Sequence, residues 1–308
     1  MNIGIVLPHA DGMMAGATPH WPDILALARH VESLNFQSIW VVDHMLFEQP
    51  AGRERVGLWE SWSLLAALAA TTTRVELGSL VLCTAFRNPA LLAKMAATVD
   101  DISGGRLILG LGAGNNAFEH HMFGYPFERR MGRFLEAITI IHGVLRTGRV
   151  DFEGRYYQAR NCELRPRGPR ERGPTIMVGT TGDRGLRTAA QFADIWNVPW
   201  PRIRNTASAF AELRPRVDAA CREVGRDPTT LSRSAAVLVE IPGTPPYPVG
   251  YPAWNRELWP PVSCSPSELA DWFQQFALAG VDHLQVWVHP STPAGVEYVA
   301  NAVELMAA

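Results

Sequence analysis

Residues 75–112 carry the sequence VELGSLVLCTAFRNPALLAKMAATVDDISGGRLILGLG, and this stretch decides the fold. Two apolar runs, Val75–Leu82 and Arg106–Gly112, show no alternation with polar residues, which is typical of parallel strands that are buried on both faces. Between them, Pro89–Ile102 has a helical pattern and places proline after Asn88, at the favoured first position of a helix. Strand, helix and strand in this order predict one unit of a parallel α/β sheet.

The same rhythm of short strands and longer helices repeats along the whole chain. The expected strands are Asn2–Leu7, Ser38–Val42, Val75–Leu82, Arg106–Gly112, Thr175–Val178, Asp194–Val198, Ser234–Ile241 and His283–Val288. The expected helices are Pro22–Leu34, Glu60–Ala70, Pro89–Ile102, Glu128–Leu145, Arg184–Phe192, Ile203–Val224, Ser267–Ala279 and Ala294–Met306, with a hairpin over Asp151–Leu164. Eight strand–helix pairs predict a (β/α)8 TIM barrel, formed as a single domain by residues 1–308. A doubly wound sheet is the alternative, but Leu7–Asp11 lacks the glycine-rich turn expected after its first strand.

The segment Pro242–Pro266 interrupts this rhythm with eight prolines and with the aromatic residues Tyr247, Tyr251, Trp254 and Trp259. It follows the seventh expected strand, so in a barrel it would lie at the C-terminal rim, where active sites form. We expect a semi-rigid wall or lid there. The alternative is a surface excursion without a role.

Composition limits the classes of function. The chain has 308 residues, 47% apolar and 19% charged, with a formal net charge of −2, which is typical of a globular enzyme. A charge this close to zero argues against broad binding to nucleic acid or to anionic membranes. The cysteines lack CxxC or metal-site spacing, and the sequence shows neither a signal peptide nor an apolar run of membrane-spanning length, so we expect a cytoplasmic protein.

Candidate functional residues follow the expected strands, because barrel enzymes place their chemistry at the C-terminal ends of strands. Asp43 and His44 follow the second strand, and a histidine there can act as a general acid or base, or can be merely structural. Small residues over 110–114 would let a flat ring approach the backbone. Residues 179–182 precede a helix and predict a phosphate-binding loop, with an ordinary capped turn as the alternative. We reject a metal site at His120 and His121, because no partner has ligand spacing.

With these residues in view, the chain resembles the luciferase-like monooxygenase superfamily of flavin- and deazaflavin-dependent oxidoreductases. The resemblance rests on IWVVDH at 39–44, the stretch 77–114, FGYPFERRMGRF at 123–134, GRYYQAR at 154–160 and GTTGDRGLRTAAQFADIWN at 179–197. The wording SGGRLILGLGAG and FRNPALLAK looks most like the actinobacterial branch that uses the deazaflavin coenzyme F420. The single lysine, Lys94, among 28 basic residues agrees with a GC-rich host.

The resemblance implies a flavin-like ring across the barrel mouth and a non-proline cis peptide at Leu80–Val81. The residues it implies around the cofactor are Asp43, Leu80, Val81, Cys83, Ala113, Gly114 and Asn116 near the ring, and Gly179, Thr180, Thr181 and Gly182 near the phosphate. Sugar-phosphate oxidising members carry a glutamate where this chain has Asn115, so that activity is not expected. His44 is therefore the first candidate for the catalytic acid, and Glu119 is the second.

Three hypotheses follow. The first is an F420-dependent oxidoreductase that transfers hydride between the deazaflavin C5 and a small hydrophobic alkene, imine or carbonyl, in a pocket formed by Trp40, Trp59 and Trp62 unless these are core residues. The second is a reduced-FMN-dependent monooxygenase served by a separate reductase; basic residues such as Arg87 or Arg184 along an exit groove would favour the anionic tail of F420 instead. The third is a non-catalytic flavin-binding barrel. We also expect a homodimer.

Overall fold

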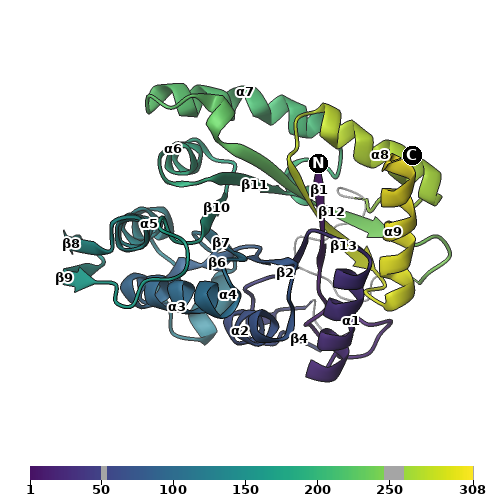
Figure 1. Cartoon of the computed structure of the whole chain (residues 1–308), viewed down its shortest axis with the longest axis horizontal. Coiled ribbons are helices and arrows are strands. Elements are labelled where there is room, and N and C mark those ends of the chain that lie inside the picture. The colour runs from purple at the N-terminus through teal and green to yellow at the C-terminus, as the bar shows by residue number, and fades with distance from the viewer. Residues whose placement is uncertain (50–53, 246–259, 308) are drawn as a thin grey trace.

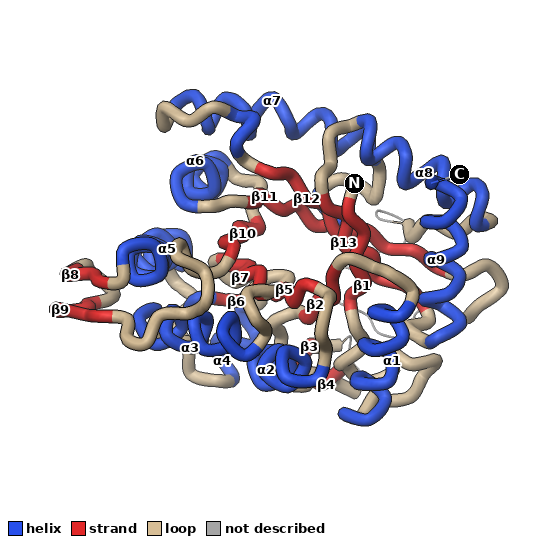
Figure 2. Tube along the Cα trace, viewed as in Figure 1, coloured by secondary structure: helices blue, strands red, loops and turns tan. Residues whose placement is uncertain are grey.

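The computed structural model describes residues 1–49, 54–245 and 260–307. Eight parallel strands form a closed barrel in the order β1 (Asn2–Val6), β2 (Ser38–Val41), β5 (Glu76–Ser79), β7 (Leu107–Gly112), β10 (Thr175–Gly179), β11 (Ile195–Pro199), β12 (Ser232–Glu240) and β13 (His283–His289). Pairing of β7 with β10 and of β13 with β1 closes the ring. Figure 2 shows the strands at the centre with the helices on the outside. The predicted TIM barrel is confirmed.

One helix packs outside the barrel after each strand. These helices are α1 (Trp21–Ser33), α2 (Ser61–Thr71), α3 (Pro89–Ile102), α5 (Arg130–Thr147), α6 (Asp183–Phe192), α7 (Ala207–Glu223), α8 (Pro266–Leu278) and α9 (Pro293–Ala307). Local signals fix their starts: Asn88 accepts hydrogen bonds from the amides of Ala90 and Leu91 at the start of α3, and Ser265 forms a capping box with Glu268 at the start of α8.

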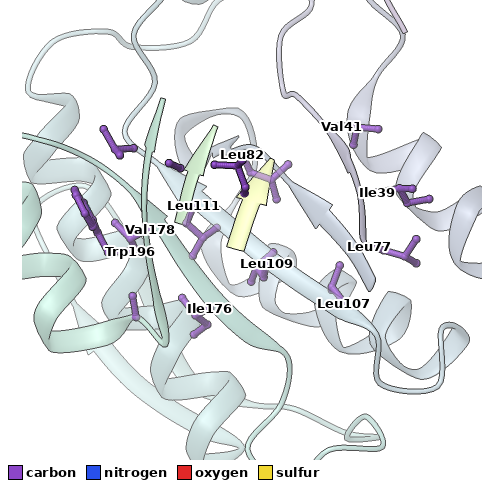
Figure 3. Close-up of a cluster of buried hydrophobic side chains, with 14 of the residues drawn as sticks. Ile39, Val41, Leu77, Leu82, Leu107, Leu109, Leu111, Ile176, Val178 and Trp196 are labelled. Carbon is purple, nitrogen blue, oxygen red and sulfur yellow. The ribbon is translucent and has the colours of Figure 1, made fainter. Parts of the chain in front are cut away.

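The alternation of side chains along β7 separates the core from the site. Leu107, Leu109 and Leu111 face outward and pack with side chains of neighbouring strands and helices (Figure 3). The residues that alternate with these leucines are Ile108, Gly110 and Gly112, and they therefore face the barrel interior. The same alternation in the other strands leaves an outer apolar layer that stabilises the barrel and an inner layer that ends beneath the barrel mouth.

Smaller elements lie in the connections between strands and helices. They are β3 (Leu46–Phe47) and β4 (Val56–Gly57), which form a short antiparallel pair, β6 (Leu82–Cys83), α4 (Ala117–Met122), and three 3-10 turns, η1 (Thr84–Phe86), η2 (Trp200–Arg202) and η3 (Pro228–Thr230). The predicted hairpin is confirmed as β8 (Arg149–Glu153) and β9 (Gln158–Glu163), which project from the edge of the molecule (Figure 1). Sequence periodicity missed β3, β4 and α4, because each is too short to show a period.

Three predicted element boundaries were wrong. The strand expected over Val75–Leu82 ends at Ser79, because a cis peptide at Leu80–Val81 turns the chain before β6 begins. The helix expected from Ile203 starts at Ala207, because Arg204 and Asn205 have positive φ. The helix expected from Glu128 starts at Arg130, after Arg129, which also has positive φ. In each case a backbone conformation that regular structure excludes sets the boundary.

The segment Pro242–Pro266 is described only in part. Residues 246–259, which include the four aromatic residues noted above, lie outside the described part of the chain. Near its end, Val262 forms an isolated parallel bridge with Val239, and α8 begins at Pro266. The segment is therefore not irregular throughout, since its C-terminal end is anchored beside β12.

Candidate active site

The C-terminal ends of the strands surround a cavity of about 530 Å³. Volumes of this size are typical of pockets for small ligands and cofactors. All thirteen residues predicted for catalysis or cofactor binding line it: Asp43, His44, Leu80, Val81, Cys83, Ala113, Gly114, Asn116, Glu119, Gly179, Thr180, Thr181 and Gly182. Their assembly follows from the barrel, which brings together residues up to 139 positions apart in sequence. Their roles stay a prediction.

The Leu80–Val81 peptide is cis, as predicted, and it places Val81 on the cavity floor. The side chain of Val81 lies between two glycines. A Cβ atom on Gly112 would lie 2.7 Å from Cγ2 of Val81, and one on Gly179 would lie 3.1 Å from it. The glycines at the ends of β7 and β10 therefore make room for Val81, and together they form a smooth apolar floor.

Asp43 lines the cavity, but its carboxylate is fully engaged by the protein. It accepts hydrogen bonds from Oγ of Ser61 at 2.6 Å and from the amide of Cys83 at 2.8 Å. The guanidinium of Arg87 donates two more, at 2.9 and 3.1 Å, and also contacts Glu60. Asp43 therefore ties the end of β2 to α2 and β6 and fixes the position of Cys83.

Neither Arg87 nor Arg184, the two arginines considered for an exit groove, lines the cavity itself. Arg87 is committed to Asp43 and Glu60, whereas Arg184 is exposed at the start of α6 and does not line the cavity. Two other arginines, Arg130 and Arg202, do line it. The sequence gave no signal for them, because Arg130 lies in the first turn of a helix and Arg202 in a 3-10 turn.

His44, which is half-buried, and Glu119, which is buried, form a pair at the cavity wall. Nδ1 of His44 lies 2.9 Å from Oε2 of Glu119, and Oε1 of Glu119 accepts hydrogen bonds from the amides of Met45 and Leu46. Burial alone would raise the pKa of Glu119, but the bonds from His44, Leu46 and Met45 together hold that pKa below its ordinary value. Glu119 therefore stays a carboxylate and is not the second acid that the sequence suggested.

The pair fixes the chemistry of the imidazole. Because the carboxylate of Glu119 only accepts hydrogen bonds, Nδ1 of His44 carries a proton. The other ring nitrogen, Nε2, points away from Glu119. The two residues are 75 positions apart in the sequence, which explains why no sequence pattern joined them.

Cys83 and His120 form a second pair that the sequence analysis missed. Sγ of Cys83 lies 3.6 Å from Nε2 of His120, whose Nδ1 lies 3.0 Å from the carbonyl oxygen of Asn116. Burial raises the pKa of the Cys83 thiol to about 12, aided by the nearby charges of Asp43 and Glu119. The thiol therefore stays protonated at neutral pH, and Cys83 offers a neutral, polarizable surface rather than a nucleophile.

The loop over residues 179–182 leads from β10 into α6. Thr181 and Gly182 line the cavity, and no side chain caps the first turn of α6, where Gly182 is the N-cap. Backbone amides of an uncapped helix start can bind an anion. Thr180 holds the loop in place through its backbone. Its amide donates to the backbone carbonyl oxygen of Asn197, and its own carbonyl accepts a hydrogen bond from Nε1 of Trp196 at 2.7 Å.

The aromatic walls of the cavity are not those expected. None of the three tryptophans expected there lines the cavity. Trp40 is buried inside the barrel, and Trp62 is buried in the hydrophobic core outside it. Trp59 is 47% exposed. Among the described tryptophans, Trp200 and Trp287 line it, and their ring centroids lie 5.3 Å apart with their planes tilted by 64°. Trp200 directly follows β11, which is a positional signal that could have found it, whereas Trp287 lies within β13.

Two kinds of feature are absent from the described part of the chain. No group of three or more histidine, cysteine, aspartate or glutamate side chains in this part of the chain has the geometry of a metal site. Among its helices, none combines the length and apolar character needed to span a bilayer.

Comparison with known proteins identifies the family. The model of the luciferase-like monooxygenase family matches residues 1–242. The chain belongs to this family. It is 36% identical over 173 residues to the pyrimidine monooxygenase RutA of Cronobacter sakazakii, a match that covers 54% of this chain and 50% of that protein. The RutA of Stutzerimonas stutzeri is 35% identical over 176 residues. The chain thus spans about half the length of the curated relatives that it matches.

Solved structures share the fold over the whole chain. An F420-dependent secondary alcohol dehydrogenase superposes with a TM-score of 0.79 at 18% identity, covering 99% of this chain and 98% of that one. The monooxygenase RslO1 from Streptomyces bottropensis superposes with a TM-score of 0.77 at 19% identity, covering 100% and 98%. At these identities the similarity shows the fold alone, so the family and fold are established and the cofactor is not.

Proposed function

We propose that this protein is a flavin-dependent monooxygenase that takes reduced FMN from a separate reductase and oxidises a small heterocyclic substrate with molecular oxygen. The observation that carries the proposal is the cavity itself, with a smooth apolar floor, an uncapped helix start at one end and the His44–Glu119 pair in its wall. The 36% identity to a pyrimidine monooxygenase favours FMN over F420, because the F420 enzymes resemble this chain only in fold.

The residues of the cavity fit a flavin. Leu80 and Val81 provide an apolar surface for a flat ring, and the thiol of Cys83 is neutral beside it. Thr181 and Gly182 place the start of α6 where a phosphate would bind the free backbone amides and the helix dipole. Reduced FMN would supply two electrons to oxygen, which a deazaflavin, with carbon in place of the reactive ring nitrogen, does not.

The chain's own contribution is to orient the substrate, exclude water and move a proton. Met13, Phe47 and Trp287 supply apolar wall on the side of the cavity where His44 lies. Within it, Nε2 of His44 can give or take the proton that accompanies oxygen transfer, while Glu119 holds the ring in place and stabilises the imidazolium form. One oxygen atom would go to the substrate, and the other would leave as water.

The test is isotope labelling in the reconstituted reaction. The protein is combined with a flavin reductase, NADH, FMN and 18O2, and uracil and related pyrimidines are screened as substrates. The proposal predicts a product heavier by one 18O atom, in an amount that depends on FMN. A reduced product without 18O, formed with reduced F420 in place of FMN, would contradict it and support hydride transfer.

A further inference from the structure

Asn197 is the buried amide at the bottom of the cavity. It lies on β11, opposite Gly179 of β10 in the strand register, and its side chain is 2% exposed. It lines the cavity together with Gly179 and Ala236. Because its strand neighbours Trp196 and Val198 pack in the outer core, the side chain of Asn197 faces the barrel interior. The amide therefore belongs to the floor of the site.

Hydrogen bonds fix which way this amide points. Oγ of Ser234 lies 3.2 Å from the carbonyl oxygen of Trp196 and 3.6 Å from Sδ of Met177, and both atoms can only accept, so the hydroxyl hydrogen is donated to one of them. Nδ2 of Asn197 then donates to Oγ of Ser234 at 2.9 Å, and it donates its second hydrogen to Oε1 of Gln285 at 2.8 Å. Both hydrogens of the Asn197 amide are used inside the protein.

The oxygen of the same amide is left for a ligand. Oδ1 of Asn197 accepts no hydrogen bond from the described residues. It is also not one of the fully buried polar atoms without a partner, so this oxygen is accessible to solvent. It therefore opens on the cavity that Asn197 lines. A fixed oxygen that can only accept is complementary to an N–H group and repels a carbonyl oxygen in the same place.

We propose that Oδ1 of Asn197 accepts a hydrogen bond from a ring N–H of the bound heterocycle and so selects ligands that carry an imide or lactam N–H at that position. The inference rests on the proposed function, in which a flat heterocycle lies on this floor. Two sources have this chemistry: the pyrimidine-like edge of the cofactor ring, and a substrate of the pyrimidine type.

The network below Asn197 supports a functional role. Gln285 is fully buried, and its Nε2 has no partner among the described residues. A buried donor without a partner destabilises a fold, so packing alone does not account for this arrangement. Exceptions of this kind are expected where a site needs a group held in one orientation.

The experiment compares each ligand with its N-methyl form in wild type and in Asn197→Leu. Oxidised FMN and 3-methyl-FMN are titrated by tryptophan fluorescence, and 5-deaza-FMN and its 3-methyl form are titrated in parallel, because both rings carry the same N–H edge. Uracil and 3-methyluracil are then titrated by calorimetry into the protein saturated with the ring that binds. No substrate turnover is needed for any of these measurements.

We expect wild type to bind the N–H form about tenfold more tightly than the N-methyl form in one series, and Asn197→Leu to reduce that ratio to near one in the same series. If Asn197→Leu loses the preference for the N–H form in the FMN or deazaflavin series, the cofactor ring is the partner of Asn197. A ratio lost in the uracil series identifies the substrate. Binding of 5-deaza-FMN without FMN would contradict the proposed function and leave the test of Asn197 intact.

Asn205→Asp is the matched control. Asn205 is also buried, but its amide is satisfied by the backbone of Leu238, to which it donates at 2.8 Å and from which it accepts at 3.0 Å. This variant should lower the melting temperature and keep the wild-type preference for N–H ligands. The inference is overturned if Asn197→Leu, folded as judged by its melting curve, keeps that preference, or if wild type shows none in any series, including the case in which no ring binds.

Discussion

At the scale of single residues, the site depends on carboxylates that act through a neighbour. The sequence placed Asp43, His44 and Glu119 at the barrel mouth correctly, but it assigned the carboxylates to contacts with ligand or to acid catalysis. The structure shows Asp43 satisfied by Ser61, Cys83 and Arg87, and Glu119 satisfied by His44 and two amides. Such partners are distant in sequence, so strand-end position predicts which residues gather but not their hydrogen bonds.

Glu119→Gln tests the positioning role. The amide keeps the size of the side chain but removes the charge that fixes and stabilises the His44 imidazole, so we expect kcat to fall about tenfold or more, with KM little changed. Glu128→Gln, an exposed glutamate before α5, serves as the control. Wild-type kcat in Glu119→Gln would contradict this role.

Cys83 gives a pH dependence of stability with a defined sign. The folded thiol has a pKa of about 12, against an ordinary value of 9.0 in the unfolded chain. Between these values the unfolded chain loses a proton that the folded protein keeps, so the free energy of unfolding falls as pH rises, by up to about 1.4 kcal/mol per pH unit. Below pH 9 this contribution is fully present.

The measurement is urea unfolding of wild type and Cys83→Ala at pH 8 and pH 10. Other groups titrate between pH 8 and pH 10 in both proteins. The difference between the stability losses of wild type and Cys83→Ala therefore reports the contribution of the Cys83 thiol alone. Wild type should lose more stability than the variant between the two pH values. Equal losses would mean that the folded thiol ionises like an exposed one.

At the scale of elements, the strands and helices were predictable from hydrophobic periodicity and from capping residues. The positions at which the backbone breaks a strand were not predictable in this way. The run Val75–Leu82 has uniform strand character, yet it breaks at Leu80–Val81, where the side chain of Val81 fits between Gly112 and Gly179. That fit involves three strand ends brought together by barrel closure. The resemblance to a known family supplied the cis peptide, whereas local propensity favoured a continuous strand.

Gly112→Ala tests the floor formed by these three strand ends. The new Cβ would lie 2.7 Å from Cγ2 of Val81, so Val81 must move toward the cavity. We expect FMN affinity to fall at least about tenfold while the protein stays folded, with a melting temperature a few degrees lower. Titration of FMN and a thermal melt check both effects.

Gly182→Ala is the paired control for folding, because a Cβ at that position meets no atom within 4 Å and its φ is −82°. Its melting temperature should match wild type. If Gly112→Ala binds FMN as tightly as wild type does, Val81 does not support the ring.

At the scale of the whole molecule, the barrel and the location of its site were predictable, and the cofactor was not. Eight strand–helix units imply closure, and closure gathers the strand ends into one cavity. FMN and F420 differ at ring position 5, in the substituents of the benzenoid ring and in the tail, and both fit a floor of glycine and aliphatic side chains. The expectations of a homodimer and of a cytoplasmic location stay predictions, and the aromatic part of Pro242–Pro266 lies outside the described residues.

The central claim, that this barrel works with reduced FMN, is tested most directly by an anaerobic titration of the protein with reduced FMN and with reduced F420. Tryptophan fluorescence reports both, since Trp200 and Trp287 line the cavity. We expect reduced FMN to bind at least about tenfold more tightly, which corresponds to about 1.4 kcal/mol of binding free energy. Tighter binding of reduced F420 by the same margin would contradict the account and make the protein a hydride-transfer enzyme.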